Sequence, residues 1–251
     1  MPINKLSPSE KDVFLDCRLR WHYQYVEKPD IPRRINSSLL RGTAGHAALE
    51  AFYSAEPSGR SLDMLIANFE QSLVEQAPED IQEWQEEEFR SAAHSGREAL
   101  QHFWKSFGTD STLYPVETEV RLARNIGDVE YHGVADGIWR PGNRVVLLEH
   151  KFPADIYGQA LEYLYWNSQH RAYAWMLDEK LPVYVQYTFC TPKKALRVEE
   201  LLISRAAMEE EERVAYNIAK STDLIYPTYG WHCQRCDFNK LCMVRLSGGD
   251  A

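Results

Sequence analysis

Asp136 and the triplet Glu149-His150-Lys151 stand on either side of a turn that reads Pro141-Gly142-Asn143. The apolar, β-branched residues before Glu149 predict a buried strand, and the alternation over residues 129–139 predicts its partner. If the turn closes a hairpin with a two-residue loop, Asp136 lies opposite Glu149, and Lys151 points to the same face. Two carboxylates and an ammonium in this arrangement could bind a divalent cation and offset negative charge on a phosphate.

Two other interpretations of these residues remain open. A register shifted by two residues would set Asp136 opposite Lys151 and would still keep all three side chains on one face. Asp, Glu and Lys on paired strands can also form a solvated face with a cross-strand ion pair. Glu149, however, follows four consecutive apolar residues, which predicts a strand buried on both faces. A buried carboxylate needs a partner or a metal ion.

The elements expected around this hairpin are helices and further strands. Helices are predicted over Thr43–Ala55 (with Thr43 as N-cap), over most of Ser61–Phe107, over Tyr157–Glu179 and over Ser204–Lys220. Strands are predicted over Pro115–Ala123, Val129–Trp139, Arg144–Phe152 and Val183–Cys190, the first three as an antiparallel meander. A sheet flanked by helices, with a helical insertion at about residues 56–110, indicates an α/β (α+β) fold.

Length and composition limit the class of protein. With 251 residues, of which 44% are hydrophobic, the chain can bury one full core, so a single domain over residues 1–251 is expected. The N-terminus does not resemble a signal peptide and no apolar run could span a membrane, which predicts a cytoplasmic protein. A net charge of −9 argues against a protein that coats nucleic acid non-specifically. Acidic clusters at residues 83–88 and 209–212 are expected on exposed helix faces.

Closely spaced cysteines near the C-terminus predict a metal site. A C-x2-C-x5-C pattern, typical of metal sites in proteins whose thiols stay reduced, is formed by Cys233, Cys236 and Cys242. A tetrahedral zinc site or an iron–sulfur cluster needs a fourth ligand, and Cys17, near the other end of the chain, is the candidate. His22 or His232 could substitute in a zinc site. Cys190 ends an apolar strand and is expected in the core.

Taken in order, these segments resemble the RecB-like branch of the PD-(D/E)xK nucleases, in particular the CRISPR-associated and phage-encoded exonucleases that carry a C-terminal cysteine cluster. The resemblance covers nearly the whole chain through Cys17, residues 42–50, 133–137, 149–151 and 169–173, and the three late cysteines. It implies a restriction-endonuclease-like core with a central mixed sheet flanked by helices. Ala135 stands where the family's name has Pro, a position that binds no metal.

The resemblance also implies a metal site. The ligands of a Mg²⁺ or Mn²⁺ ion would be His46, on the first of the predicted helices, the carboxylates of Asp136 and Glu149, and the backbone carbonyl of His150. The His150 side chain is expected to face away from the site, because neighbouring side chains on a strand alternate faces.

Further roles follow from the same resemblance. Lys151 would orient the attacking water or stabilise charge on the scissile phosphate. Gln169 and Tyr173, four residues apart, would orient DNA or support Lys151; packing on an amphipathic helix is the alternative for both. The four cysteines would hold a [4Fe-4S] cluster that joins the two chain ends, with structural Zn²⁺ as the alternative.

The expected function is that of a Mg²⁺- or Mn²⁺-dependent deoxyribonuclease. The resemblance implies an exonuclease, with endonuclease activity as a further option, that acts on single-stranded DNA or DNA ends in recombination, repair, phage DNA processing or CRISPR adaptation. Its host would be bacterial, archaeal or phage-infected, and its partners DNA and a recombination, helicase or CRISPR adaptation protein. The alternatives are a catalytically silent DNA-end-binding subunit and a zinc-stabilised interaction subunit. Basic residues that could contact DNA or lie on an ordinary solvated surface are Arg33, Arg34, Arg41, Lys193, Lys194 and Arg197.

Overall fold

The computed structural model describes residues 3–31, 35–78, 83–114, 116–156, 164, 167–198 and 200–247. The chain divides into two compact units. The terminal unit comprises residues 1–34, 123–133 and 209–251, and the central unit comprises residues 35–122 and 134–208. Among the described helices, none is long and apolar enough to cross a membrane.

The central unit is built on a mixed sheet. Its middle strand, β4 (Val145–Lys151), pairs antiparallel with β3 (Val129–Trp139) and parallel with β5 (Val183–Cys190). Beyond β5, the antiparallel strands β6 (Ala195–Arg197) and β7 (Leu201–Leu202) both pair with it. On the other side of the sheet, β2 (Val116–Ile126) pairs with β3. The predicted α/β fold with a central mixed sheet is therefore confirmed.

The register of the β3–β4 hairpin is the one that a two-residue loop predicts. The paired residues are Trp139↔Val146, Ile138↔Leu147 and Gly137↔Leu148, so the alternative register shifted by two residues is wrong. All residues of β4 before Lys151 are buried. The side chain of Glu149 is only 2% exposed, which rules out the solvated-face interpretation of this strand.

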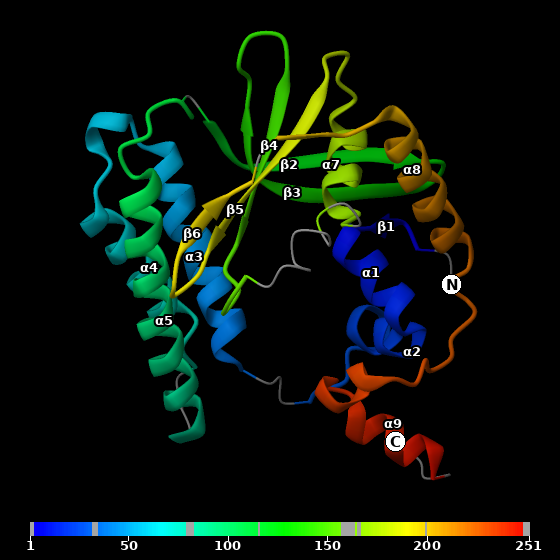
Figure 1. Ribbon diagram of the computed structural model, residues 1–251. Helices are drawn as coiled ribbons and strands as arrows, with labels where there is room; N and C mark the ends of the chain where they lie inside the picture. The colour runs from blue at the N-terminus through cyan, green and yellow to red at the C-terminus, as the bar shows by residue number, and fades with distance from the viewer. Residues whose placement is uncertain are drawn as a thin grey trace. The chain divides into compact units, whose positions relative to one another are not determined.

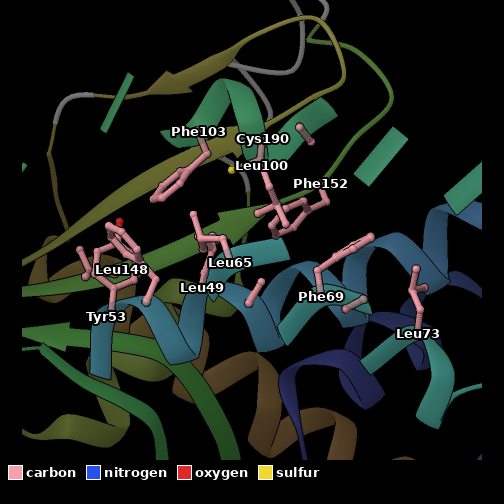
Figure 2. Close-up of a cluster of buried hydrophobic side chains, with 14 of the residues drawn as sticks. Leu49, Tyr53, Leu65, Phe69, Leu73, Leu100, Phe103, Leu148, Phe152 and Cys190 are labelled. Carbon is pink, nitrogen blue, oxygen red and sulfur yellow. The ribbon is translucent and has the colours of Figure 1, made fainter. Parts of the chain in front are cut away.

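Three helices cover one face of the central sheet. These are α3 (Ser37–Ser54), α4 (Leu62–Glu75) and α5 (Glu83–Phe107), which pack against one another, while α5 also contacts β5 and β6 (Figure 1). Leu49, Phe69 and Leu100 from these helices form one buried core with Leu148 and Phe152 from the region of β4 (Figure 2).

Helix α3 begins six residues before the predicted start. Its N-cap is Asn36, whose side chain accepts a hydrogen bond from the Leu39 amide at 2.9 Å, so the prediction of Thr43 as N-cap was wrong. Thr43 instead lies inside the helix. Gly42 and Gly45 also lie inside the helix, so tertiary packing overrides their low helix propensity.

On the opposite face, α7 (Gln169–Leu177) contacts β4. It is shorter than the predicted helix over residues 157–179, of which residues 157–163, 165 and 166 lie outside the described residues. Ser168 caps the start of α7, and Asp178 ends it in the left-handed conformation at φ 50°. Helices therefore flank the sheet on both faces, as predicted.

The terminal unit contains the first and last elements of the chain. Its short strand β1 (Lys5–Leu6) pairs in parallel with Glu130 and Tyr131 of β3. Its helical elements are α1 (Pro8–Asp16), α2 (Arg18–Trp21), the π-helix η1 (His22–Glu27), most of α8 (Arg205–Lys220), the 3-10 helix η3 (Trp231–Arg235) and α9 (Asn239–Leu246).

A buried ion pair links these segments within the terminal unit. The Lys11 ammonium on α1 donates to the Glu211 carboxylate on α8, and both side chains are almost completely buried. The Tyr131 hydroxyl donates to the same carboxylate at 2.6 Å. Glu211 was predicted on an exposed helix face, and that prediction was wrong because its partners lie 200 and 80 positions away in sequence.

Candidate active site

Asp136 on the hairpin contacts helix α3 and the neighbouring strand β4. Nδ1 of His46 on α3 lies 3.2 Å from Oδ1 of Asp136 on β3. The backbone amide of His150 donates to the other carboxylate oxygen, Oδ2, at 2.7 Å. One carboxylate thus joins a helix, β3 and β4, all within the central unit.

A second chain of hydrogen bonds runs from β4 to helix α7. The Lys151 ammonium donates to Oε2 of Glu149 at 3.0 Å and to Oε1 of Gln169 at 3.4 Å. The Gln169 amide in turn donates to the Tyr173 hydroxyl at 2.8 Å. Gln169 therefore contacts Lys151 directly, and Tyr173 contacts Gln169.

The pKa values of the Asp136 and Glu149 carboxyl groups are shifted in opposite directions. Burial alone would raise the pKa of Asp136, but the hydrogen bond and the charge of His46 outweigh burial and hold that pKa below its usual range. Burial raises the pKa of Glu149, and the neighbouring Lys151 ammonium only partly opposes it. Pairs of titratable groups whose pKa values are pushed apart are typical of catalytic sites.

The His150 side chain points away from these groups, as the strand alternation predicts. Its ring stacks on Tyr53 of α3, with the ring centroids 5.2 Å apart and the planes 5° from parallel. Complete burial lowers the pKa of this imidazole to about 3, so the ring is neutral. Only the backbone of His150 is therefore available to the site.

One buried oxygen at the site is unsatisfied. Oε1 of Glu149 accepts no hydrogen bond from any residue that the structure describes, although it is fully buried. A buried carboxylate oxygen of this kind is costly unless a cation or a donor reaches it. His46 and Asp136 bond to each other, and Glu149 bonds to Lys151. Within the described ranges, no three His, Cys, Asp or Glu side chains lie close enough together to hold a metal ion.

Comparison with known proteins identifies the family. The family model of the PD-(D/E)XK nuclease superfamily matches residues 5–243, which is nearly the whole chain. The chain belongs to this superfamily. It is therefore a nuclease, and nucleases of this superfamily generally use divalent metals such as Mg²⁺ or Mn²⁺. A search of the curated proteins found no match.

One of two similar solved structures supports the fold of this nuclease. A protein from Eubacterium rectale described as a "Putative exonuclease" superposes with a TM-score of 0.58 at 10% sequence identity, covering 94% of this chain and 88% of that one. The protein SSO0001 is 19% identical over 89% of this chain and 94% of its own, with a TM-score of 0.40. At this level of identity, the first likeness supports the architecture of the sheet and its helices.

The four cysteines of the predicted metal site line one cavity in the terminal unit of the nuclease. The cavity has a volume of about 80 Å³, and its lining includes Cys17, Cys233, Cys236 and Cys242. Cys17 is buried, and the Thr228 amide donates to its sulfur at 3.4 Å. Tyr23 and Phe238 pack beside it, so much of the wall is apolar. Cys190 is completely buried in the core of the central unit, as predicted.

Several basic residues have roles that the sequence did not reveal. Arg41 is only 4% exposed and donates to the backbone, so it is neither a solvated surface residue nor a contact for DNA. Arg197 pairs with Asp110 at 2.6 Å, and Lys193 pairs with Asp155. No sequence signal marks these partners, because Arg41 bonds to a residue 111 positions away and Arg197 to one 87 positions away.

Proposed function

We propose that this nuclease is a metal-dependent DNA exonuclease, acting on single-stranded DNA or on DNA ends, with its active site formed by His46, Asp136, Glu149, Lys151, Gln169 and Tyr173. The observation that carries the proposal is the unsatisfied buried oxygen of Glu149 beside an ammonium that is already held in place from two sides. Such an oxygen fits a hard cation, and the ammonium fits a phosphate.

The chemical types of these donors suit Mg²⁺ or Mn²⁺, although His46 bonds to Asp136 and Glu149 to Lys151 rather than converging on one point. Asp136 and Glu149 would supply carboxylate oxygens, His46 a ring nitrogen and His150 its backbone carbonyl. When bound, the ion lowers the pKa of a water molecule and offsets charge on the phosphate. The low pKa of Asp136 keeps this carboxylate ionised at neutral pH, so one anionic ligand is available before any cation arrives.

Lys151 would contact the substrate. Its ammonium is shared between Glu149 and Gln169, and a cation bound to Glu149 would compete for that carboxylate. Lys151 would then turn one donor toward the scissile phosphate or the attacking water while Gln169 keeps its position. Tyr173 fixes Gln169, since its hydroxyl accepts from the Gln169 amide.

The cavity lined by four cysteines would hold a [4Fe-4S] cluster, with zinc as the alternative metal. The four thiols that line this cavity match the number of protein ligands of a [4Fe-4S] cluster and of a structural zinc site. The apolar surroundings, and the amide that donates to the Cys17 sulfur, favour iron–sulfur chemistry, because both features are typical of protected clusters. After anaerobic purification, iron content and absorbance at about 400 nm distinguish the cluster from zinc.

End-labelled oligonucleotides test the proposed activity. Single- and double-stranded DNA labelled at either end is incubated with Mg²⁺ or Mn²⁺, and a circular single strand serves as the substrate without ends. We expect progressive shortening of linear DNA from one end and an intact circle. Asp136→Asn, Glu149→Gln and Lys151→Met should each lower the rate by about 100-fold or more, since each removes a ligand or the phosphate contact.

Glu87→Gln is the matched control, because this carboxylate on α5 is 71% exposed and distant from the hairpin in sequence. It should retain the wild-type rate. Cleavage of the circle would indicate an endonuclease instead. Binding of DNA ends without hydrolysis under either metal would overturn the proposed activity and identify a silent end-binding subunit. In recombination, repair, phage DNA processing or CRISPR adaptation, such ends would be delivered by a partner, for example a helicase.

A further inference from the structure

Helix α3 holds the residue that directly follows Lys151. Nε and Nη2 of Arg41 both donate to the backbone carbonyl of Phe152, at 3.1 and 3.0 Å, and Nη1 donates to the Ser95 hydroxyl at 3.1 Å. No carboxylate among the described residues forms an ion pair with Arg41. A buried guanidinium without a counter-charge is costly, and Arg41 offsets this cost with hydrogen bonds from all three of its side-chain nitrogens, two of them to one backbone carbonyl.

The side chain of Phe152 is held by the same helix. Gly45 lies one turn after Arg41, and a Cβ atom built on it would come within 2.4 to 2.6 Å of the Phe152 ring. The ring therefore sits directly against the α3 backbone, inside the buried core (Figure 2). Gly45 is followed by His46, whose ring centroid lies 5.8 Å from that of Phe152.

Residues 41–46 thus join two of the three elements that supply proposed metal ligands. His46 is supplied by α3, whereas Glu149 and the His150 carbonyl are supplied by β4, and nothing in the covalent chain fixes one against the other. The contacts of Arg41 and Gly45 with Phe152 attach the end of β4 to α3 at a point next to both. A rigid attachment here sets the spacing between the two groups of ligands.

We propose that Arg41 and Gly45 are positioning residues that fix the end of β4 against α3, and so adapt the site to Mg²⁺ in preference to more tolerant cations. This inference rests on the proposed function. Mg²⁺ demands near-ideal octahedral geometry at short distances and gives up its waters reluctantly. Mn²⁺ accepts more distorted ligand sets. Loosening the attachment should therefore weaken Mg²⁺ binding more than Mn²⁺ binding.

The test measures metal affinity without DNA. Binding of Mn²⁺ is followed by electron paramagnetic resonance, and Mg²⁺ affinity is obtained by competition. Arg41→Met removes the guanidinium, and Arg41→Lys keeps the charge but loses the fork that holds one carbonyl. Gly45→Ala pushes on the Phe152 ring. We expect Mg²⁺ affinity to fall by about 10- to 100-fold in Arg41→Met, the range for residues that support metal ligands, and Mn²⁺ affinity to fall less.

Arg60→Met is the matched control within the same unit. Arg60 is 7% exposed and donates to three backbone carbonyls, those of Ala55, Asp110 and Leu113, none of which adjoins the site. It should lower the melting temperature as Arg41→Met does, yet leave the ratio of Mg²⁺ to Mn²⁺ affinity unchanged.

Each outcome decides the inference. An unchanged affinity ratio in Arg41→Met would assign Arg41 a purely structural role and overturn it. If Arg41→Met does not fold, the ratio in Arg41→Lys and Gly45→Ala decides in the same way. Wild-type protein that binds Mn²⁺ but hydrolyses no DNA would overturn the proposed function while the ratio still tests the positioning. Wild-type protein that binds no Mn²⁺ would overturn both.

Discussion

Glu149 is both deeply buried and a proposed metal ligand. Its strand is buried on both faces, so its carboxylate is deprived of water, and one of its oxygens has no donor among the described residues. Burial favours the protonated acid, whereas the Lys151 ammonium favours the carboxylate. A cation would compete with both the proton and Lys151 for the same group. The readiness of the site to bind metal should therefore depend on pH.

We expect Mn²⁺ affinity to fall as the pH is lowered below neutrality. Burial raises the pKa of Glu149 to about 7, so below that pH a proton occupies the oxygen that the cation needs. His46, whose pKa is raised by Asp136 despite its burial, titrates in the same direction. Metal titrations from about pH 5.5 to about pH 8 should show a shallower dependence in Glu149→Gln, where only the His46 part remains. Equal slopes in the wild type and the variant would contradict this assignment.

Among the elements, the hairpin was the easiest to predict and α3 the hardest. The turn residues and the apolar run fixed the strand bounds of β3, the register, and the common face of Asp136 and Glu149. These are local properties. The start of α3 depends on a cap at Asn36 and on packing against α4 and α5, whereas the prediction relied on Thr43 as the cap.

The burial of Arg41 and of Glu211 was missed for a related reason. Glu211 stands in an acidic stretch of helix and Arg41 precedes the predicted helix, and charged side chains usually face water. Each is buried because a partner from a distant part of the chain reaches it, the Phe152 carbonyl in one case and Lys11 in the other. Periodicity within a helix carries no information on such partners.

The packing of α4 against α5 can be tested at one glycine. A Cβ atom on Gly96 of α5 would lie 2.0 Å from the ring of Phe69, which is fully buried on α4. Gly96→Ala should therefore lower the free energy of unfolding by about 1–3 kcal/mol. Gly42→Ala is the control, because no atom lies within 4 Å of its Cβ position inside α3. It should raise stability by about 0.5–1 kcal/mol. Chemical denaturation measures both, and a stable Gly96→Ala would disprove the close contact.

On the scale of the whole molecule, the two proposed metal centres belong to different units. The ligands proposed for Mg²⁺ or Mn²⁺ lie in the central unit, and the cysteine cavity lies in the terminal unit. Loss of one centre therefore removes no ligand from the other. An effect of the cysteines on hydrolysis would arise through stability rather than through chemistry at the phosphate.

Cys17→Ser and Cys190→Ser separate the cluster from the core. Cys17→Ser should lose most of the bound iron and lower the melting temperature, because a site of four thiolates couples metal binding to folding. Cys190→Ser should keep full iron, since Cys190 is buried in the core of the central unit. Iron analysis and thermal denaturation of the two variants side by side check this. Full iron in Cys17→Ser would move the fourth ligand to His22 or His232.

The order of the terminal unit's segments along the chain determines when the unit can fold during synthesis. Its three stretches, residues 1–34, 123–133 and 209–251, are separated along the chain by the two stretches of the central unit, and they leave the ribosome in this order. Both stretches of the central unit are finished before the last of these emerges. The Lys11 side chain can be buried with its partner only once Glu211 has been synthesised. Helix α1 is thus synthesised well before it can reach its final environment, and the Lys11 ammonium stays hydrated until α8 has emerged.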